Sequence, residues 1–167
     1  MMARADEKKK KLIDAARRKV FILYEGKRTP HRSCGICLAE TFNLPTQPYQ
    51  SLRRGGITGE GQCGAIKAGE LILGQYLGDP DPTGAVTDAL RSAMQYYSRR
   101  WKEELGLPTA LDTICNRLVE PFGEFTGEPR AQFCAHLATE VAGLVAETLL
   151  EFGVQFEITP IEGLEGR

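Results

Sequence analysis

The sequence has no apolar run that approaches the roughly 20 residues of a membrane span. Its apolar stretches are short, as in residues 20–24, and its first residues lead into lysines rather than into an apolar segment. We therefore expect no membrane span and no secretory signal, and we predict a cytoplasmic protein. In that compartment thiols stay reduced unless they are catalytic or bind metal.

The signatures of nucleotide and hydrolase chemistry are also missing. The glycine-rich run 55–61 does not follow a predicted strand and lacks the Gly-Lys-Ser/Thr ending of a phosphate-binding loop. No dinucleotide fingerprint or serine nucleophile motif occurs, and the acids Glu103, Glu104 and Asp112 show no paired arrangement suited to acid–base catalysis. We therefore expect no nucleotide cofactor.

The sequence has almost no excess of charge of either sign, because its net charge is −1. The charges are, however, unevenly spread along the chain. Residues 1–32 hold 11 of the 21 Lys and Arg residues and only four of the 22 acids. Such a segment attracts nucleic acid or an anionic surface in some proteins. The lysine run has no interleaved aromatic residues, so a solvated helix face explains it better than a nucleic-acid surface does.

Hydrophobic periodicity predicts an all-α protein, because apolar residues recur at helical spacing in segments separated by Gly and Pro. The predicted helices span residues 6–24, 34–42, 62–77, 83–105, 109–119 and 128–152. Their predicted buried faces include Leu23 in the first helix, Ala65 and Ile72 in the third, Val86 and Tyr97 in the fourth, and Val141 in the sixth.

These segments predict one domain, an irregular bundle of about six helices. We expect a basic N-terminal helix within residues 1–30, a cysteine-bearing helical domain over 31–153, and a tail over 154–167. Alternating Val154, Phe156 and Ile158 in the tail predict a short strand or an extended segment on the surface.

Five cysteines stand out, namely Cys34, Cys37, Cys63, Cys115 and Cys134. Cys63 follows the glycine-rich run and is expected in the first turn of a helix, where unpaired N–H groups and the helix dipole favour a thiolate. With Lys67 one turn further on, we predict a lowered pKa for Cys63. The competing interpretation is that free cysteines pack as small hydrophobic residues.

Generic cysteine motifs fit the sequence poorly. Cys34 and Cys37 form a C-x-x-C pair. A zinc ribbon requires a second close pair of cysteines, and the sequence has none. Leu38 stands where covalent haem attachment needs histidine, so no haem is expected. The βαβ pattern of thioredoxin-like proteins is absent as well.

The combined layout resembles a family of small bacterial and archaeal redox-active proteins named for their C-GCAxxG-C-C pattern. The resemblance covers roughly residues 30–152 and has four matching segments. They are Ser33-Cys34-Gly35-Ile36-Cys37-Leu38-Ala39-Glu40, Gly61-Gln62-Cys63-Gly64-Ala65-Ile66-Lys67-Ala68, Thr113-Ile114-Cys115-Asn116-Arg117-Leu118 and Phe133-Cys134-Ala135-His136-Leu137. The sequence departs from the pattern at Gln62 and at Ala68, which replaces the last glycine and has Gly69 beside it.

The resemblance implies that Cys34, Cys63, Cys115 and Cys134 share one site, as redox-active thiols or as metal and cofactor ligands. Cys37 is extra to the pattern and is a spare thiol, a resolving partner for Cys34 or plain packing. His31 lies three residues before Cys34 and is a further candidate ligand, whereas His136 is expected to face solvent.

Three functions follow from these residues. The first is a redox protein whose four cysteines cycle as thiols or hold an iron–sulfur cluster for electron transfer with an unidentified partner. The second is a zinc-binding module in which the metal only stabilises the fold. The third is a nucleic-acid or partner-binding protein acting through the basic first helix.

Overall fold

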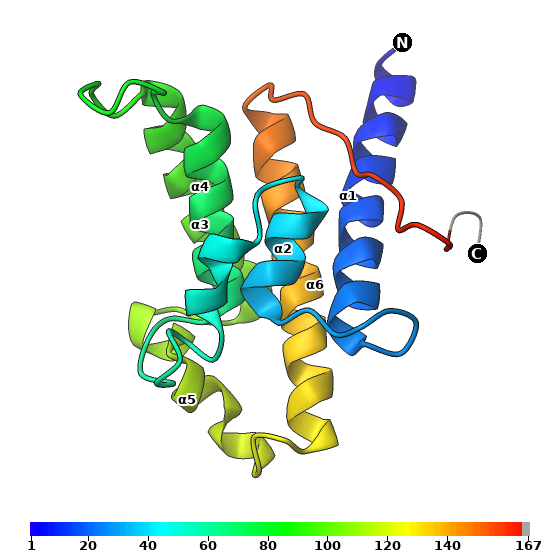
Figure 1. The fold of residues 1–167 in the computed structure, drawn as a ribbon. Coiled ribbons are helices and arrows are strands. Elements are labelled where there is room, and N and C mark those ends of the chain that lie inside the picture. The colour runs from blue at the N-terminus through cyan, green and yellow to red at the C-terminus, as the bar shows by residue number, and fades with distance from the viewer. Residues whose placement is uncertain (165–167) are drawn as a thin grey trace.

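Six α-helices form an irregular bundle in the computed structural model, which describes residues 1–164 (Figure 1). The all-α prediction is confirmed. The helices are α1 (Met2–Glu25), α2 (Cys34–Thr41), α3 (Gly64–Leu77), α4 (Asp88–Leu105), α5 (Cys115–Val119) and α6 (Glu128–Glu151). Three short 3-10 helices join them, η1 (Gln47–Leu52), η2 (Ala110–Thr113) and η3 (Glu120–Phe122).

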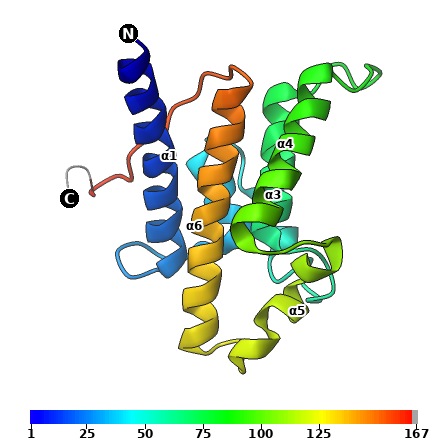
Figure 2. The same cartoon turned by 180° about the vertical axis from the view of Figure 1, so that it is seen from behind.

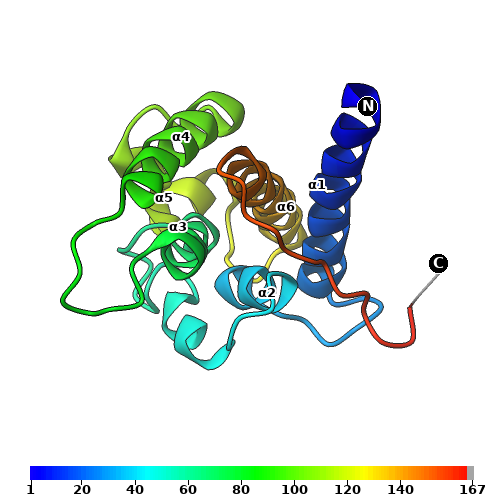
Figure 3. The ribbon, with the colours of Figure 1, turned by 90° about the horizontal axis from the view of Figure 1, so that it is seen from above.

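Helix α6 is the centre of the bundle, and α1, α2, α3 and α4 all pack against it. Figure 2 shows α1 on one side of α6 and the α3–α4 pair on the other, and Figure 3 shows α2 closing the remaining side. By length and composition α6 is the one helix of residues 1–164 that could cross a membrane, but 61% of its most apolar window is buried inside the bundle. That burial is typical of the central helix of a bundle.

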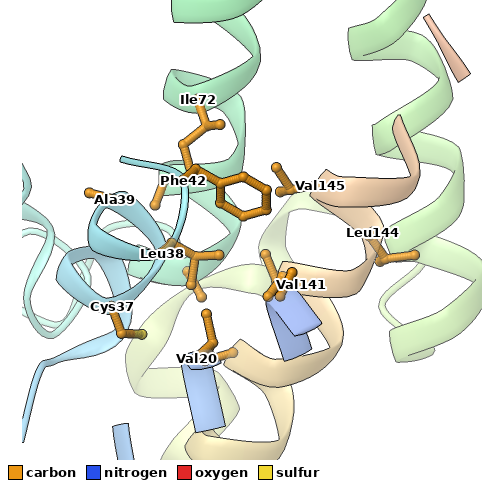
Figure 4. Packing of buried hydrophobic residues seen from close by; sticks show 14 of the residues in the cluster. Val20, Cys37, Leu38, Ala39, Phe42, Ile72, Val141, Leu144 and Val145 are labelled. Atoms are coloured by element: carbon orange, nitrogen blue, oxygen red, sulfur yellow. The ribbon is translucent and has the colours of Figure 1, made fainter. Parts of the chain in front are cut away.

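The core forms where the predicted apolar stripes meet. Val20 of α1, Leu38 and Phe42 at α2, and Val141 and Val145 of α6 are buried and point toward one another (Figure 4). Gly26, with φ +71°, ends α1 in the left-handed conformation that glycine adopts without steric cost.

Two predicted helix starts were wrong. The fourth helix begins at Asp88 rather than at residue 83, because Thr87 caps it: its Oγ1 accepts from Leu90 N at 3.1 Å. Val86 therefore precedes the helix and is 57% exposed, instead of belonging to the buried stripe. The third helix begins at Gly64, and Cys63 is its N-cap residue.

The predicted helix 109–119 is also divided. Residues 110–113 form η2, Ile114 is extended with φ −67° and ψ 128°, and α5 starts at Cys115. Ile114 is extended because it forms an isolated antiparallel bridge with Gln62. This bridge joins the glycine-rich loop to α5.

The tail forms an extended segment, and no strand ladder occurs within the described residues. Lys19 Nζ donates to Thr159 O at 2.7 Å, Asn43 Nδ2 donates to Glu157 O at 2.9 Å, and Phe156 packs on Phe42. Residues 165–167, the end of the predicted tail, lie outside the described residues.

Gly69 gives a test of the packing between α3 and α4. A Cβ at Gly69 would collide with Oη of Tyr97, a fully buried side chain whose hydroxyl donates to Ile66 O at 3.0 Å. We expect Gly69→Ala to lower the free energy of unfolding by about 1–3 kcal/mol, measured by urea denaturation. Gly74→Ala is the control, because no atom lies within 4 Å of its added Cβ. The control should gain about 0.5–1 kcal/mol, since alanine favours the helix. Equal effects from both changes would contradict the described packing.

Candidate functional site

All four cysteines of the family pattern line one cavity of about 190 Å³. It lies at the end of the bundle where α1 ends, α2 and α3 begin, and α5 and the first turns of α6 approach (Figure 1). Its lining consists of Tyr24, His31, Ser33, Cys34, Arg53, Arg54, Cys63, Gly64, Cys115, Leu118, Val119, Phe125, Arg130, Phe133, Cys134 and Leu137.

Cys37 has a different environment from the other four. It is fully buried in the core beside Leu38 and does not line the cavity (Figure 4). Its Sγ donates to the carbonyl oxygen of Cys34 at 3.0 Å, as a packed thiol on a helix often does. The geometry therefore separates Cys37 from the set that shares the cavity.

Backbone hydrogen bonds hold Cys63 beside Cys115, although 52 residues separate them in the sequence. Cys63 N donates to Thr113 O at 2.7 Å, and Cys115 N donates to Gly61 O at 2.9 Å. Asn116 N extends the pairing by donating to Gly59 O at 2.9 Å. The pairing gives the N–H groups of half-buried Cys63 and buried Cys115 a partner, which backbone groups away from water require.

Two glycines let the backbone approach the sulfur-bearing side chains closely. A Cβ at Gly64 would lie 2.7 Å from Cys34 Sγ and would also collide with the carbonyl oxygen of Leu52. A Cβ at Gly55 would lie 2.5 Å from Cys115 Cβ. Glycine at both positions therefore allows the close approach, and the contact at Gly64 brings Cys34 Sγ next to the residue that follows Cys63.

The loop before Cys63 has an unusual left-handed turn. Arg54, Gly55, Gly56 and Ile57 all have positive φ, at +50°, +59°, +75° and +73°. Ile57 N donates to Arg53 O at 2.6 Å, which closes the turn. A left-handed residue other than glycine costs roughly 1–2 kcal/mol, and a β-branched one such as Ile57 is a rare outlier. Backbone strain of this kind clusters at functional sites.

Aromatic rings and arginines form one wall of the cavity. The guanidinium carbon of Arg54 lies 4.6 Å from the centre of the Phe125 ring, and that of Arg130 lies 4.3 Å from the same ring. Arg130 Nη1 donates to Tyr24 Oη at 3.0 Å, and its Nε donates to Phe125 O at 2.5 Å. Phe122 and Phe133 stack nearby with ring centres 4.5 Å apart.

His31 and Ser33 lie at the cavity on the segment that leads into α2. His31 Nδ1 donates to the carbonyl oxygen of Tyr24, which leaves Nε2 available. Ser33 occupies the N-cap position of α2, but its side chain makes no capping bond, and its buried Oγ has no hydrogen-bond partner among the described residues. His136 is exposed, as expected.

Burial raises the pKa of the cavity thiols. The pKa of Cys34 rises to about 11, first because of burial and then because of the nearby Cys134 and Cys115. Burial also raises the pKa values of Cys63 and Cys115. Charge on Cys134 contributes to the raised pKa of all three, so the Cys134 side chain lies near each of them.

The predicted lowering of the Cys63 pKa was therefore wrong. The N–H groups of Ile66 and Ala65 do act in the predicted direction, but burial outweighs them. Lys67 does not help, because its Nζ pairs with Glu70 Oε2 at 2.6 Å. Local sequence position favoured a thiolate, and the surrounding structure opposes it.

The arrangement does not fit a single metal ion. Within residues 1–164, no group of three or more His, Cys, Asp and Glu side chains lies close enough together to hold one. All five cysteines are free thiols. The zinc and iron–sulfur hypotheses therefore rest on the types of residue present and not on a preformed ligand geometry.

Comparison of the chain with protein-family models, curated proteins and solved structures finds no match.

Sequence reasoning missed several residues of the cavity, chiefly Tyr24, Phe125 and Arg130. No local pattern marks them, since Tyr24 and Arg130 lie within ordinary helices and Phe125 lies in a turn. The adjacent pair Arg53 and Arg54, directly before the glycine-rich run, was the one available signal.

The raised pKa of Cys34 predicts an unusual pH profile of alkylation. With a pKa of about 11, its thiolate fraction at pH 7 is about 100-fold below that of a free thiol of pKa 9.0. The rate of reaction with iodoacetamide, followed by mass spectrometry, should be half-maximal near pH 11 and should still rise beyond pH 10.5. The same cysteine in urea-unfolded protein should be half-maximal near pH 9 and level off near pH 10. The pH of the half-maximal rate does not depend on accessibility, so a folded-state value at or below that of the unfolded protein would contradict the prediction.

Proposed function

We propose that this chain is a cytoplasmic thiol-redox protein related to the C-GCAxxG-C-C family, with Cys34, Cys63, Cys115 and Cys134 as its redox site. The observation that carries the proposal is that these four thiols, and not Cys37, line one cavity. Disulfide chemistry needs only two thiols in contact at a time, so it is compatible with an arrangement that does not fit a metal ion.

Cys34 and Cys63 are the proposed working couple. Cys34 Sγ lies against the Cα of Gly64, directly after Cys63, and charge on Cys34 is the second-largest cause of the raised Cys63 pKa after burial. Their separation in sequence, 29 residues, means that a bond between them would tie the start of α2 to the start of α3. Oxidation would therefore stiffen the region that shapes the cavity.

The proposed reaction is thiol–disulfide exchange. Cys34 Sγ attacks one sulfur of a disulfide-bearing partner, and the bond between the partner's two sulfurs breaks. Cys63 Sγ then attacks Cys34 Sγ and releases the second partner sulfur. The chain loses two electrons and two protons, and the partner becomes a dithiol or two thiols. Cys115 and Cys134 are placed to compete for the same mixed disulfide.

The protein purified without oxygen gives the test of this proposal. The protein is titrated in buffers of oxidised and reduced dithiothreitol, digested without reduction and analysed by mass spectrometry. We expect a Cys34–Cys63 disulfide whose formation is a two-electron oxidation. Cys34→Ala and Cys63→Ala should each remove it. The matched control is Cys37→Ala, which should leave the bond and its midpoint potential unchanged, because Cys37 lies outside the cavity.

Metal content of the same preparation decides between this proposal and the two metal hypotheses. If the protein contains stoichiometric iron and sulfide, and Cys34→Ala loses them, the thiol-redox proposal would give way to an iron–sulfur cluster. If the protein contains one zinc per chain and unfolds when a chelator removes it, the thiol-redox proposal would give way to a structural zinc site. A Cys34–Cys37 bond in place of Cys34–Cys63 would also overturn the proposed couple.

A further inference from the structure

The charges around the cavity are unbalanced. Arg53, Arg54 and Arg130 line it, and no aspartate or glutamate does. Within residues 1–164 none of these three arginines makes an ion pair with a carboxylate. Arg53 and Arg54 are exposed at the cavity, where Arg53 Nη1 donates to Gln50 Oε1 at 3.2 Å, and Arg130 is half-buried.

Two of the unpaired guanidinium groups are held near each other. Arg54 and Arg130 both lie over the ring of Phe125, and Arg130 is fixed further by its bonds to Tyr24 and to the Phe125 carbonyl. Arg54 begins the left-handed turn, so a strained backbone presents it. Two cations that line one cavity repel each other, and an anion bound in the cavity would relieve that repulsion.

Nothing else at the cavity supplies the missing negative charge. Burial raises the pKa of Cys34, Cys63 and Cys115, so these thiols are mostly neutral near pH 7. The buried Oγ of Ser33 has no partner among the described residues, so it is available to donate a hydrogen bond to a ligand. An anion in this cavity would find three guanidinium groups and one hydroxyl, beside the thiols.

We propose that the cavity selects a small disulfide that carries carboxylate groups, which the arginines bind while Cys34 attacks the sulfur. Planar guanidinium groups bind carboxylates through paired hydrogen bonds, and such charged bonds are stronger than neutral ones. The cavity volume of about 190 Å³ favours a small molecule over a folded partner. This inference rests on the proposed redox function.

The exchange is balanced for such a substrate. Cys34 Sγ forms a bond to one substrate sulfur, the substrate S–S bond breaks, and one carboxylate-bearing thiolate leaves. Cys63 Sγ then displaces the second. The two protons of the cysteine thiols pass to the two departing thiolates, so two substrate thiols and one protein disulfide result.

Three disulfides of similar length and different charge test the inference. They are 3,3′-dithiodipropionate (dianionic), bis(2-hydroxyethyl) disulfide (neutral) and cystamine (dicationic). The rate of Cys34–Cys63 formation with each, measured by quenched mass spectrometry, is divided by the rate of the same disulfide with urea-unfolded protein. We expect the normalised rate to favour the dianion over the neutral compound by about 10-fold, to be lowest for the dication, and to lose this preference in high salt.

Arginine variants assign the preference to the cavity. Arg53→Gln with Arg54→Gln should lower the dianion-to-neutral ratio toward one, with part of the preference left to Arg130. Arg91→Gln, at an exposed position on α4, is the matched control and should keep the wild-type ratio. Arg130→Lys keeps the charge, loses the planar fork, and should lower the ratio in part, without the risk to Tyr24 that a neutral residue would bring.

The outcomes separate this inference from the proposed function. A Cys34–Cys63 bond that forms equally fast with all three disulfides would overturn the anion preference and leave the redox function standing. A preference that persists at the wild-type ratio in the Arg53 and Arg54 double variant would overturn its assignment to the cavity arginines and would also leave the redox function standing. If no disulfide yields the Cys34–Cys63 bond in the wild-type protein, both proposals fall.

Discussion

The short backbone pairing between residues 59–63 and 113–116 is the constraint on which the cavity depends. Three hydrogen bonds of 2.7–2.9 Å join two loops that are distant in sequence, and they place Cys63 beside Cys115. The same bonds stop the helix predicted over 109–119, because Ile114 must be extended to take part. Gly55 is required there, since a Cβ would meet both Cys115 and Gly61. The glycine-rich run therefore forms a tightly packed contact between the start of α3 and the start of α5.

Burial lowers the reactivity of the thiols at this contact. Close packing brings the thiols together, but it removes water that would stabilise their thiolates, and their pKa values rise. Arg54 and Arg130 act in the opposite direction on Cys115, more weakly than burial does. A site of this kind keeps its thiols largely protonated at neutral pH, so exchange at Cys34 depends on a substrate that is held against its sulfur. A bound anion would not lower those pKa values, so the arginines serve to position a substrate more than to activate a nucleophile.

Much of the fold could be predicted from the sequence, because helical periodicity is a local property. The buried positions Leu23, Ile72 and Val141 follow directly from spacing. The start of α4 could not be predicted as well, because Thr87 is one of several plausible caps in a stretch rich in Pro and Asp. The ionisation of Cys63 could not be predicted at all, since helix position is local and burial depends on the whole bundle.

The arginines show the same limit at the level of the site. Arg54 precedes the glycine-rich run and Arg130 lies 76 residues later at the start of α6, so only the fold brings both over Phe125. Arg54 is exposed and Arg130 is half-buried, so water screens part of their charge, and both remain accessible to a ligand. The chain also holds Arg54 and Ile57 at positive φ, which costs conformational free energy. Backbone strain lowers stability, and strain beside a thiol-lined cavity that also carries arginines is better explained by a ligand than by folding.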